Sequence, residues 1–383
     1  MKEEENTAMD HRKILYLHIG MPKTGTSSLQ LFLMQNQEAL ARHGFAYPMM
    51  PGRYPLVCPN RNAHFLVGKA KDASGCEDPI RTDEIQKQSF ELLENVFQIN
   101  DKVILSEEAI WNTYKPNNPR CIRMIRSFCQ ERNIKLKLIV YLRRQDYYLE
   151  SYWKQKILKC GARWSWKQMI KKTPKYIVLN YYKHLEQLAK EVGRENILVQ
   201  LYYEKNFDLC YDFLKVLAIQ QTDLFEPLEE KINPSMNNNY AEIKRIMNGL
   251  LSEDFGQRTK EQKWLKKIVM DCVTEEKTQY KSSMFSEEER HEFMEGVEKS
   301  NRKIAREYMG RDQLFDDIKE QTQKLPTWTP DNHLQYEDTV AFFGKALLEI
   351  KREQEMHYAE LKQRTAAQRS IFQKAIDKCR TMI

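Results

Sequence analysis

The chain has 383 residues, of which 41% are hydrophobic, 11% aromatic and 30% charged, and its formal net charge is +7. This size and apolar content suffice for a sizeable core. The mild positive charge gives no reason to expect nucleic-acid binding, and it fits either an enzyme with anionic ligands or a basic solvated surface. No run of 18 apolar residues occurs, so no membrane-spanning helix is expected.

The cysteines and the N-terminal residues bear on the compartment of the protein. Eight cysteines are scattered through the chain without a C-x-x-C pair or a metal-ligand spacing, which is typical of buried, reduced thiols. Met1–Lys13 is polar and lacks the apolar stretch of a signal peptide. We therefore expect a soluble, cytoplasmic protein without a metal site.

Apolar runs that alternate with helical patterns indicate the fold class. Ile14–Ile19 is a short apolar run that ends at a glycine, as a buried parallel strand does, and Ser28–His43 has the spacing of an amphipathic helix. The later candidates are strands at Val103–Leu105, Leu136–Leu142 and Asn196–Tyr202 and helices at Gln145–Leu158 and Tyr182–Val192. This alternation predicts an α/β fold with a central, mostly parallel sheet flanked by helices. Residues 47–82 show little periodicity and predict a long loop region that shapes a binding site.

The chain is predicted to have three parts. Residues 1–12 are expected to be a disordered segment, residues 13–325 one domain, and residues 331–383 a helical C-terminal extension. Within the extension, Val340, Phe343, Leu347 and Ile350 keep a 3-4 spacing. Two interpretations stay open: the extension associates copies of the chain as a coiled coil, which makes a homo-oligomer, or it packs on its own domain.

The segment after the first strand has the chemistry of an anion-binding loop. It reads GMPKTGTSS, from Gly20 to Ser28, and leads into a helix. Backbone N–H groups in such a loop converge on one point, and the helix dipole adds to their field. Gly20 and Gly25 have the spacing of an NTPase P-loop, but Thr26 stands where that loop has its lysine. Lys23 lies inside the loop instead. We expect it to reach a bound phosphate from a different side and either to protonate or to neutralise the bridging oxygen of a leaving phosphate.

The string PKTGTSS after a strand resembles the 5′-phosphosulfate loop of sulfotransferases that use PAPS (3′-phosphoadenosine 5′-phosphosulfate). The resemblance runs from about Lys13 to Phe315, and Tyr182–Glu204 is similar to a segment of bacterial members that sulfate carbohydrates or other cell-surface compounds. It implies a P-loop NTPase-like sulfotransferase fold and transfer without a metal ion. The residues that it assigns to the phosphosulfate end of PAPS are Lys23, Thr24, Gly25, Thr26, Ser27 and Ser28.

The same resemblance implies a second binding element. The family has an arginine at the end of a strand and a serine about two helical turns later, which together hold the 3′-phosphate of PAPS. Arg143 and Ser151 match these positions, and a guanidinium group makes bidentate contacts to phosphate. Arg144 stands where the family often has a polar residue, and a surface ion pair is the alternative for this arginine pair.

Three side chains are candidates for the base that accepts the proton of the sulfate acceptor. Glu107 and Glu108 follow a strand, where a carboxylate faces the ligand crevice of an α/β sheet. Bacterial members of the family often have Ser-Ser-Glu there, which assigns the role to Glu108, with Glu107 as the fallback. Capping of the next helix is the structural alternative. His64, in the loop region, is the second candidate, because histidine suits base chemistry near neutral pH.

These observations predict a PAPS-dependent sulfotransferase whose acceptor is a hydroxyl or amine, on a carbohydrate or another cell-surface compound. Two other functions compete with it. A small-molecule kinase is disfavoured because the Gly-Lys-Ser/Thr order and an obvious Mg²⁺-binding aspartate after a strand are missing. A non-catalytic nucleotide-binding scaffold is disfavoured because Lys23, Arg143 and Ser151 are all present.

Overall fold

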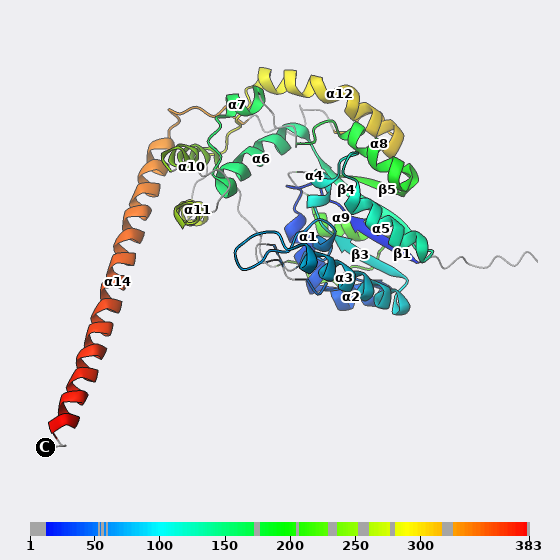
Figure 1. The fold of residues 1–383 in the computed structure, drawn as a ribbon. Helices are drawn as coiled ribbons and strands as arrows, with labels where there is room; N and C mark the ends of the chain where they lie inside the picture. Colours follow the sequence, from blue (N-terminus) through cyan, green and yellow to red (C-terminus); the bar gives the residue numbers. More distant parts are fainter. Residues whose placement is uncertain are drawn as a thin grey trace, which may run out of the picture. The chain divides into compact units, whose positions relative to one another are not determined.

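In the part of the chain that the structure describes, five strands form the central sheet, in the order β2-β3-β1-β4-β5 (Figure 1). Every pairing between the described strands is parallel, so the predicted α/β fold with a parallel sheet is confirmed. Four strands occur where the apolar runs predict them, whereas β2 has two residues and is too short to produce a periodic signal. The bounds are Ile14–His18 for β1, Phe45–Ala46 for β2, Lys102–Ser106 for β3, Lys135–Arg143 for β4 and Ile197–Tyr202 for β5.

The structure is a computed structural model that describes residues 13–52, 54, 57–58, 60–171, 177–203, 207–228, 236–251, 260–275, 280–315 and 325–380. The predicted disordered segment, residues 1–12, lies outside them. The described residues form two compact units. The first takes its residues from Met1–Tyr152, Gln168–Asn233 and Ser286–Lys324, and the second from Trp153–Lys167, Pro234–Phe285 and Leu325–Ile383. The division into residues 13–325 and 331–383 stays a prediction.

Helices connect the strands of the first unit. They are α1 Thr26–Gln35, α2 Gln37–Arg42, α3 Pro79–Ile99, α4 Ala109–Thr113, α5 Arg120–Glu131, α8 Tyr181–Val192, α9 Leu209–Val216 and α12 Glu287–Met309, with the 3-10 turns η1 His64–Leu66 and η2 Arg194–Asn196. Two further helices, α6 Gln145–Cys160 and α7 Trp166–Lys171, each have residues in both units.

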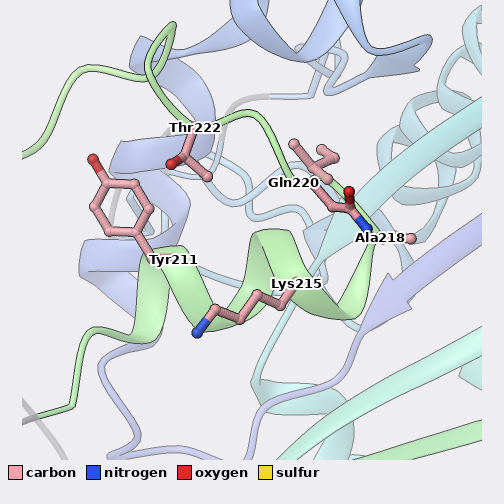
Figure 2. Close-up of a pocket in the computed structure, with 6 residues that line it drawn as sticks. Tyr211, Lys215, Ala218, Gln220 and Thr222 are labelled. Atoms are coloured by element: carbon pink, nitrogen blue, oxygen red, sulfur yellow. The ribbon is translucent and has the colours of Figure 1, made fainter.

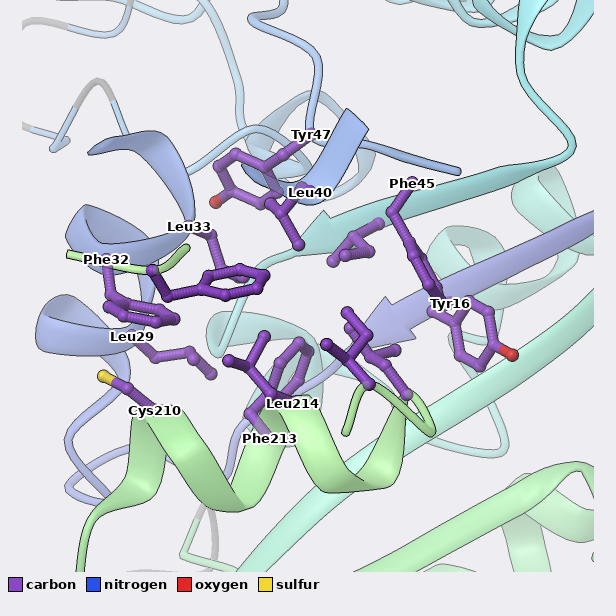
Figure 3. Packing of buried hydrophobic residues seen from close by; sticks show 14 of the residues in the cluster. Tyr16, Leu29, Phe32, Leu33, Leu40, Phe45, Tyr47, Cys210, Phe213 and Leu214 are labelled. Atoms are coloured by element: carbon purple, nitrogen blue, oxygen red, sulfur yellow. The ribbon is translucent and has the colours of Figure 1, made fainter. Parts of the chain in front are cut away.

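Both faces of the sheet are buried, as is usual for parallel sheets. Side chains of alternate strand residues, among them Tyr16, Ile104 and Tyr141, pack with apolar side chains of α1, α2 and α9 (Figure 3). The intervening residues point to the other face by the two-residue period of a strand. Those intervening residues are fully buried as well, including Leu17 and Leu138, and α3 and α5 pack on β3 and β4.

The structure divides the helix predicted at Ser28–His43 into α1 and α2. The Nδ2 atom of Asn36 donates to the carbonyl of Phe32 at 2.9 Å and to that of Glu226 at 3.0 Å, and the φ of Asn36 is −102°. A short amide side chain that binds nearby carbonyls competes with the helical backbone. The helix therefore ends before Asn36, and α2 begins after it.

One long helix begins inside the region predicted as a loop. The side chain of Asp78 accepts a hydrogen bond from the backbone N–H of Arg81 at 3.0 Å, and Pro79 occupies the first position of α3. Both residues are typical helix starts. The loop region therefore ends at residue 78 and not at residue 82.

The second unit is helical. It contains α10 Asn238–Leu250, α11 Lys260–Glu275 and α14 Gln335–Arg380, which packs against both. The predicted helical C-terminal extension is thus confirmed as a single helix of 46 residues. None of the helices in the described part of the chain combines the length and the apolarity that crossing a bilayer requires.

The strand order brings three chain segments to one edge of the sheet. From the central strand β1 the chain moves to one side to form β2 and β3, and then to the other side to form β4 and β5. The carboxyl ends of β1, β3 and β4 therefore meet at a topological switch point, which is where open α/β sheets bind ligands. The glycine loop, the two glutamates and Arg143 follow or end these strands.

Candidate active site

The loop after β1 holds a lysine in a backbone conformation that favours glycine. Gly20 and Gly25 have φ values of 101° and 73°, and Lys23 has a φ of 72°. A residue with a Cβ atom loses about 1–2 kcal/mol in the left-handed region, whereas glycine loses none. A loop residue that keeps this energetic cost is a candidate for a functional role.

Hydrogen bonds fix this loop to the end of β4. The Met21 N–H donates to the carbonyl of Tyr141 at 3.1 Å, and the Tyr141 N–H donates to the carbonyl of Gly20 at 2.8 Å. Beyond them, Nη1 of Arg143 donates to the carbonyl of Lys23 at 2.7 Å. The structure therefore brings Lys23 and Arg143 together, although 120 residues separate them in sequence.

The first turn of α1 presents amide groups at the end of the loop. Gly25 is the N-cap residue and, in the part of the chain that the structure describes, no side chain caps α1. The N–H groups of Thr26, Ser27 and Ser28 therefore begin the helix without a side-chain acceptor from the described residues. Thr24 is buried, and its Oγ1 donates to the carbonyl of Met21 at 2.7 Å. Uncapped amides at a helix start, beside a lysine and an arginine, fit a sulfate or phosphate group.

Glu108 lies directly against this loop. A Cβ atom placed on Gly20 would be 3.0 Å from the Cβ of Glu108 and 3.1 Å from its Cα, so the two backbones touch. Oε2 of Glu108 accepts a hydrogen bond from Nε2 of Gln30 at 3.0 Å, and Oε1 is paired with Arg61. Burial raises the pKa of the Glu108 carboxyl above its usual 4.5, the charge of Glu107 raises it further, and Arg61 opposes both effects.

Glu107 is fully buried and has a different set of partners. Its Oε1 lies 3.2 Å from Nη1 of Arg61 and accepts from the Ala109 N–H at 2.8 Å. Its Oε2 lies 2.6 Å from Nδ1 of His64, which η1 supplies. The structure thus gathers all three candidate bases in one cluster, held together by Arg61. The Ala109 contact shows that Glu107 also caps the start of α4.

His18 is hydrogen-bonded to Ser106, the residue before Glu107. Its Nδ1 lies 2.9 Å from Oγ of Ser106, which also accepts from Nε2 of Gln30 at 3.1 Å. The ring is buried against Phe213 and Tyr141, and this burial lowers the pKa of His18 to about 3. His18 is therefore neutral at ordinary pH and has a structural role.

The two arginines at the end of β4, Arg143 and Arg144, have separate environments. Arg144 is buried and contacts both carboxylate oxygens of Asp146, at 2.8 and 2.7 Å. Its guanidinium is engaged in the fold, and Arg143 remains at the glycine loop. Ser151 is half-buried in the second turn of α6, and its contact with a phosphate stays a prediction.

Sequence reasoning missed Gln30 and Arg61. Gln30 is a buried polar residue between the apolar residues of α1, and a polar residue in an apolar helix face is a usable signal. Arg61 lies in the long loop region, which has no periodicity and offers no such signal. Among the described residues, no group of three or more His, Cys, Asp or Glu side chains is arranged to hold a metal ion; transfer without a metal stays a prediction.

A hollow at the end of α9 shares no lining residue with this cluster. It has a volume of about 530 Å³ and is lined by Tyr211, Lys215, Ala218, Ile219, Gln220 and Thr222 (Figure 2). None of the predicted site residues lines it. The glycine loop approaches α9 at the opposite end of that helix, where Leu209 lies next to Gly25. We therefore place the candidate site at the loop and not at this hollow.

Comparisons with known proteins give distant likenesses. No protein-family model matches the chain. An uncharacterized protein of Archaeoglobus fulgidus is 32% identical over 219 residues, which are 56% of this chain and 55% of that protein, so the chain spans about half of its relative. Among solved structures, a sulfotransferase from Alicyclobacillus acidocaldarius is similar with 15% identity and a TM-score of 0.35, over 61% of this chain and 92% of that one. The function is therefore argued from the site itself.

Proposed function

We propose that this chain transfers a sulfuryl group from PAPS to a hydroxyl group, on a carbohydrate or a related cell-surface compound. The observation that carries the proposal is Lys23, held in a left-handed conformation between two glycines and beside Arg143. A lysine retained in such a conformation, in an anion-binding loop at the switch point of the sheet, is best explained by contact with a charged group in a reaction.

The donor would be held at two places. The N–H groups of the loop and of the first turn of α1 would hold its phosphosulfate end, together with the hydroxyl groups of Ser27 and Ser28. Arg143 and Ser151 would hold its 3′-phosphate, as the family resemblance implies. The donor supplies an activated sulfuryl group and a phosphate leaving group.

Lys23 and Glu108 would have complementary roles in the transfer. The acceptor oxygen forms a bond to sulfur while the bond between sulfur and the phosphate oxygen breaks, and negative charge accumulates on that oxygen. The Lys23 ammonium neutralises this charge, and the carboxylate of Glu108 accepts the proton of the acceptor hydroxyl.

The position of Glu108 favours it over His64 as the base. Glu108 touches Gly20 of the loop, and its raised pKa makes it a better proton acceptor than an ordinary carboxylate. Both oxygens of each glutamate have partners within the protein, but Glu107 is completely buried, whereas Glu108 retains an exposure of 8%. We assign to Glu107 and His64 the role of holding Arg61, which in turn positions Glu108.

Transfer of labelled sulfate from PAPS to an acceptor panel tests the proposal. We expect Glu108→Gln to lower the transfer rate by about 100- to 10,000-fold, the usual contribution of a general base, and His64→Gln to lower it far less. The exposed Glu91 offers a matched control, and Glu91→Gln should leave the rate unchanged. Equal losses for Glu108→Gln and His64→Gln would contradict the assignment of the base. Transfer from ATP with Mg²⁺ in place of PAPS would contradict the function.

A further inference from the structure

Among the residues that the structure describes, only those in the first part of α14 are covered by its own unit. α14 packs against α10 and α11 (Figure 1). In this part of α14, Phe342 and Ala346 are buried, and Glu349 pairs with Lys267 of α11 at 2.8 Å. Every side chain that the structure describes between residues 351 and 368 is exposed. With 46 residues, α14 is about 69 Å long. Because a helix without tertiary packing is only marginally stable in water, the second half of α14 requires a partner.

An apolar stripe runs along the side of α14 that its own unit leaves uncovered. We define it as Tyr336, Val340, Phe343, Leu347, Ile350, Tyr358 and Leu361, all of which are exposed. At about 100° per residue these positions cluster on one side of the helix, about a third of a turn from the buried Phe342. Leu347, for example, exposes 67% of its surface. An exposed apolar stripe of this length marks an interaction surface, although the polar residue Gln354 interrupts it between Ile350 and Tyr358.

The charges of α14 are divided between its two halves. Residues 337–360 contain six acidic and three basic side chains, whereas residues 361–380 contain one acidic and six basic side chains. Two such helices side by side in the same direction would set acidic half against acidic half and basic half against basic half. In opposite directions, each acidic half faces a basic half, which is the favourable arrangement.

We propose that α14 is a dimerisation helix that pairs in antiparallel orientation with α14 of a second copy of this chain. The apolar stripes of the two helices form the contact. With the twofold axis next to Glu355, Leu361 of each copy lies opposite Ile350 of the other, and Glu360 lies opposite Lys351. The pairing is independent of the proposed transfer reaction.

Sedimentation equilibrium of the full chain tests the contact surface. We expect a species of twice the 45.8 kDa mass of the chain. Two charges introduced into the stripe, Leu347→Glu with Leu361→Glu, should weaken the dimer at least about 100-fold. The matched control is Ala359→Glu with Gln363→Glu, which adds the same charge on the opposite side of the helix and should leave the dimer within about threefold of the unchanged chain. A chain that is monomeric at every concentration, or a dimer that the stripe variant leaves intact, would overturn the proposal.

A second pair of substitutions tests the orientation. Lys362→Glu with Arg364→Glu reverses charges in the basic half, so an antiparallel dimer loses attractions and should weaken about tenfold. The dissociation constant of the unchanged chain should also rise with salt concentration, because opposite charges attract across the contact. A dimer that the reversal strengthens, or that salt strengthens, is parallel and would refute the antiparallel pairing. Circular dichroism of each variant at high concentration shows whether the rest of the chain remains folded.

Discussion

The conformation of Lys23 leads to a prediction in which two substitutions have the same effect on activity but different effects on stability. Lys23→Ala and Lys23→Gly both remove the ammonium group, so both should lose transfer by several orders of magnitude. The two variants differ in their backbones. Alanine keeps the cost of the left-handed conformation at φ 72°, about 1–2 kcal/mol, whereas glycine removes it.

The stability difference follows from these two terms. Glycine also has more conformational freedom in the unfolded chain, which lowers the free energy of unfolding and offsets about 0.4–1 kcal/mol of this gain. Lys23→Gly should therefore be more stable than Lys23→Ala by about 1 kcal/mol, a factor of about five in the folding equilibrium. Urea unfolding of the two variants measures the difference. A Lys23→Gly protein that is less stable than Lys23→Ala would show that the loop is not strained at this residue, and full activity in either variant would remove Lys23 from the reaction.

Three further predictions concern the neighbours of this loop. Gly20→Ala should lower stability by about 1–3 kcal/mol more than Gly75→Ala: both glycines have positive φ, but only at Gly20 does an added Cβ meet Glu108, and equal losses would contradict the contact. Arg143→Ala should weaken binding of PAP (3′-phosphoadenosine 5′-phosphate, the nucleotide left after sulfuryl transfer) by about 1.5–3 kcal/mol in calorimetry. The change in kcat should be smaller, and an equal effect on binding and on kcat would contradict a role in donor binding. Burial lowers the pKa of His18 from 6.5 to about 3, so the unfolded state binds a proton at His18 at a higher pH than the folded state does. The free energy of unfolding should therefore fall by about 2 kcal/mol through this group by pH 5. His18→Asn should reduce this loss in pH-dependent urea unfolding, and an unchanged pH dependence would contradict it.

The sequence predicts the sheet well, because its strands are buried on both faces and appear as short apolar runs. The runs at β1 and β4 are examples. Polar contacts between segments that are distant in sequence are what it predicts poorly. Asn36, at which the first helix divides, donates to the carbonyl of Glu226, 190 residues away in sequence. No local pattern contains such information.

The candidate site shows the same contrast. The loop with Lys23 and the end of β4 with Arg143 carry recognisable motifs, and the structure brings them together. Arg61 sits in a loop region without periodicity, and only the fold reveals that it joins Glu107 and Glu108. A sequence also does not distinguish the environments of two adjacent glutamates, since burial and partners differ only after folding.

Titration calorimetry of the full chain with PAP, and with PAPS in competition, tests the central claim most directly. The account predicts that one PAP molecule binds per chain, that PAPS displaces it, and that Arg143→Ala weakens both interactions. A properly folded protein that takes up neither nucleotide would contradict the account.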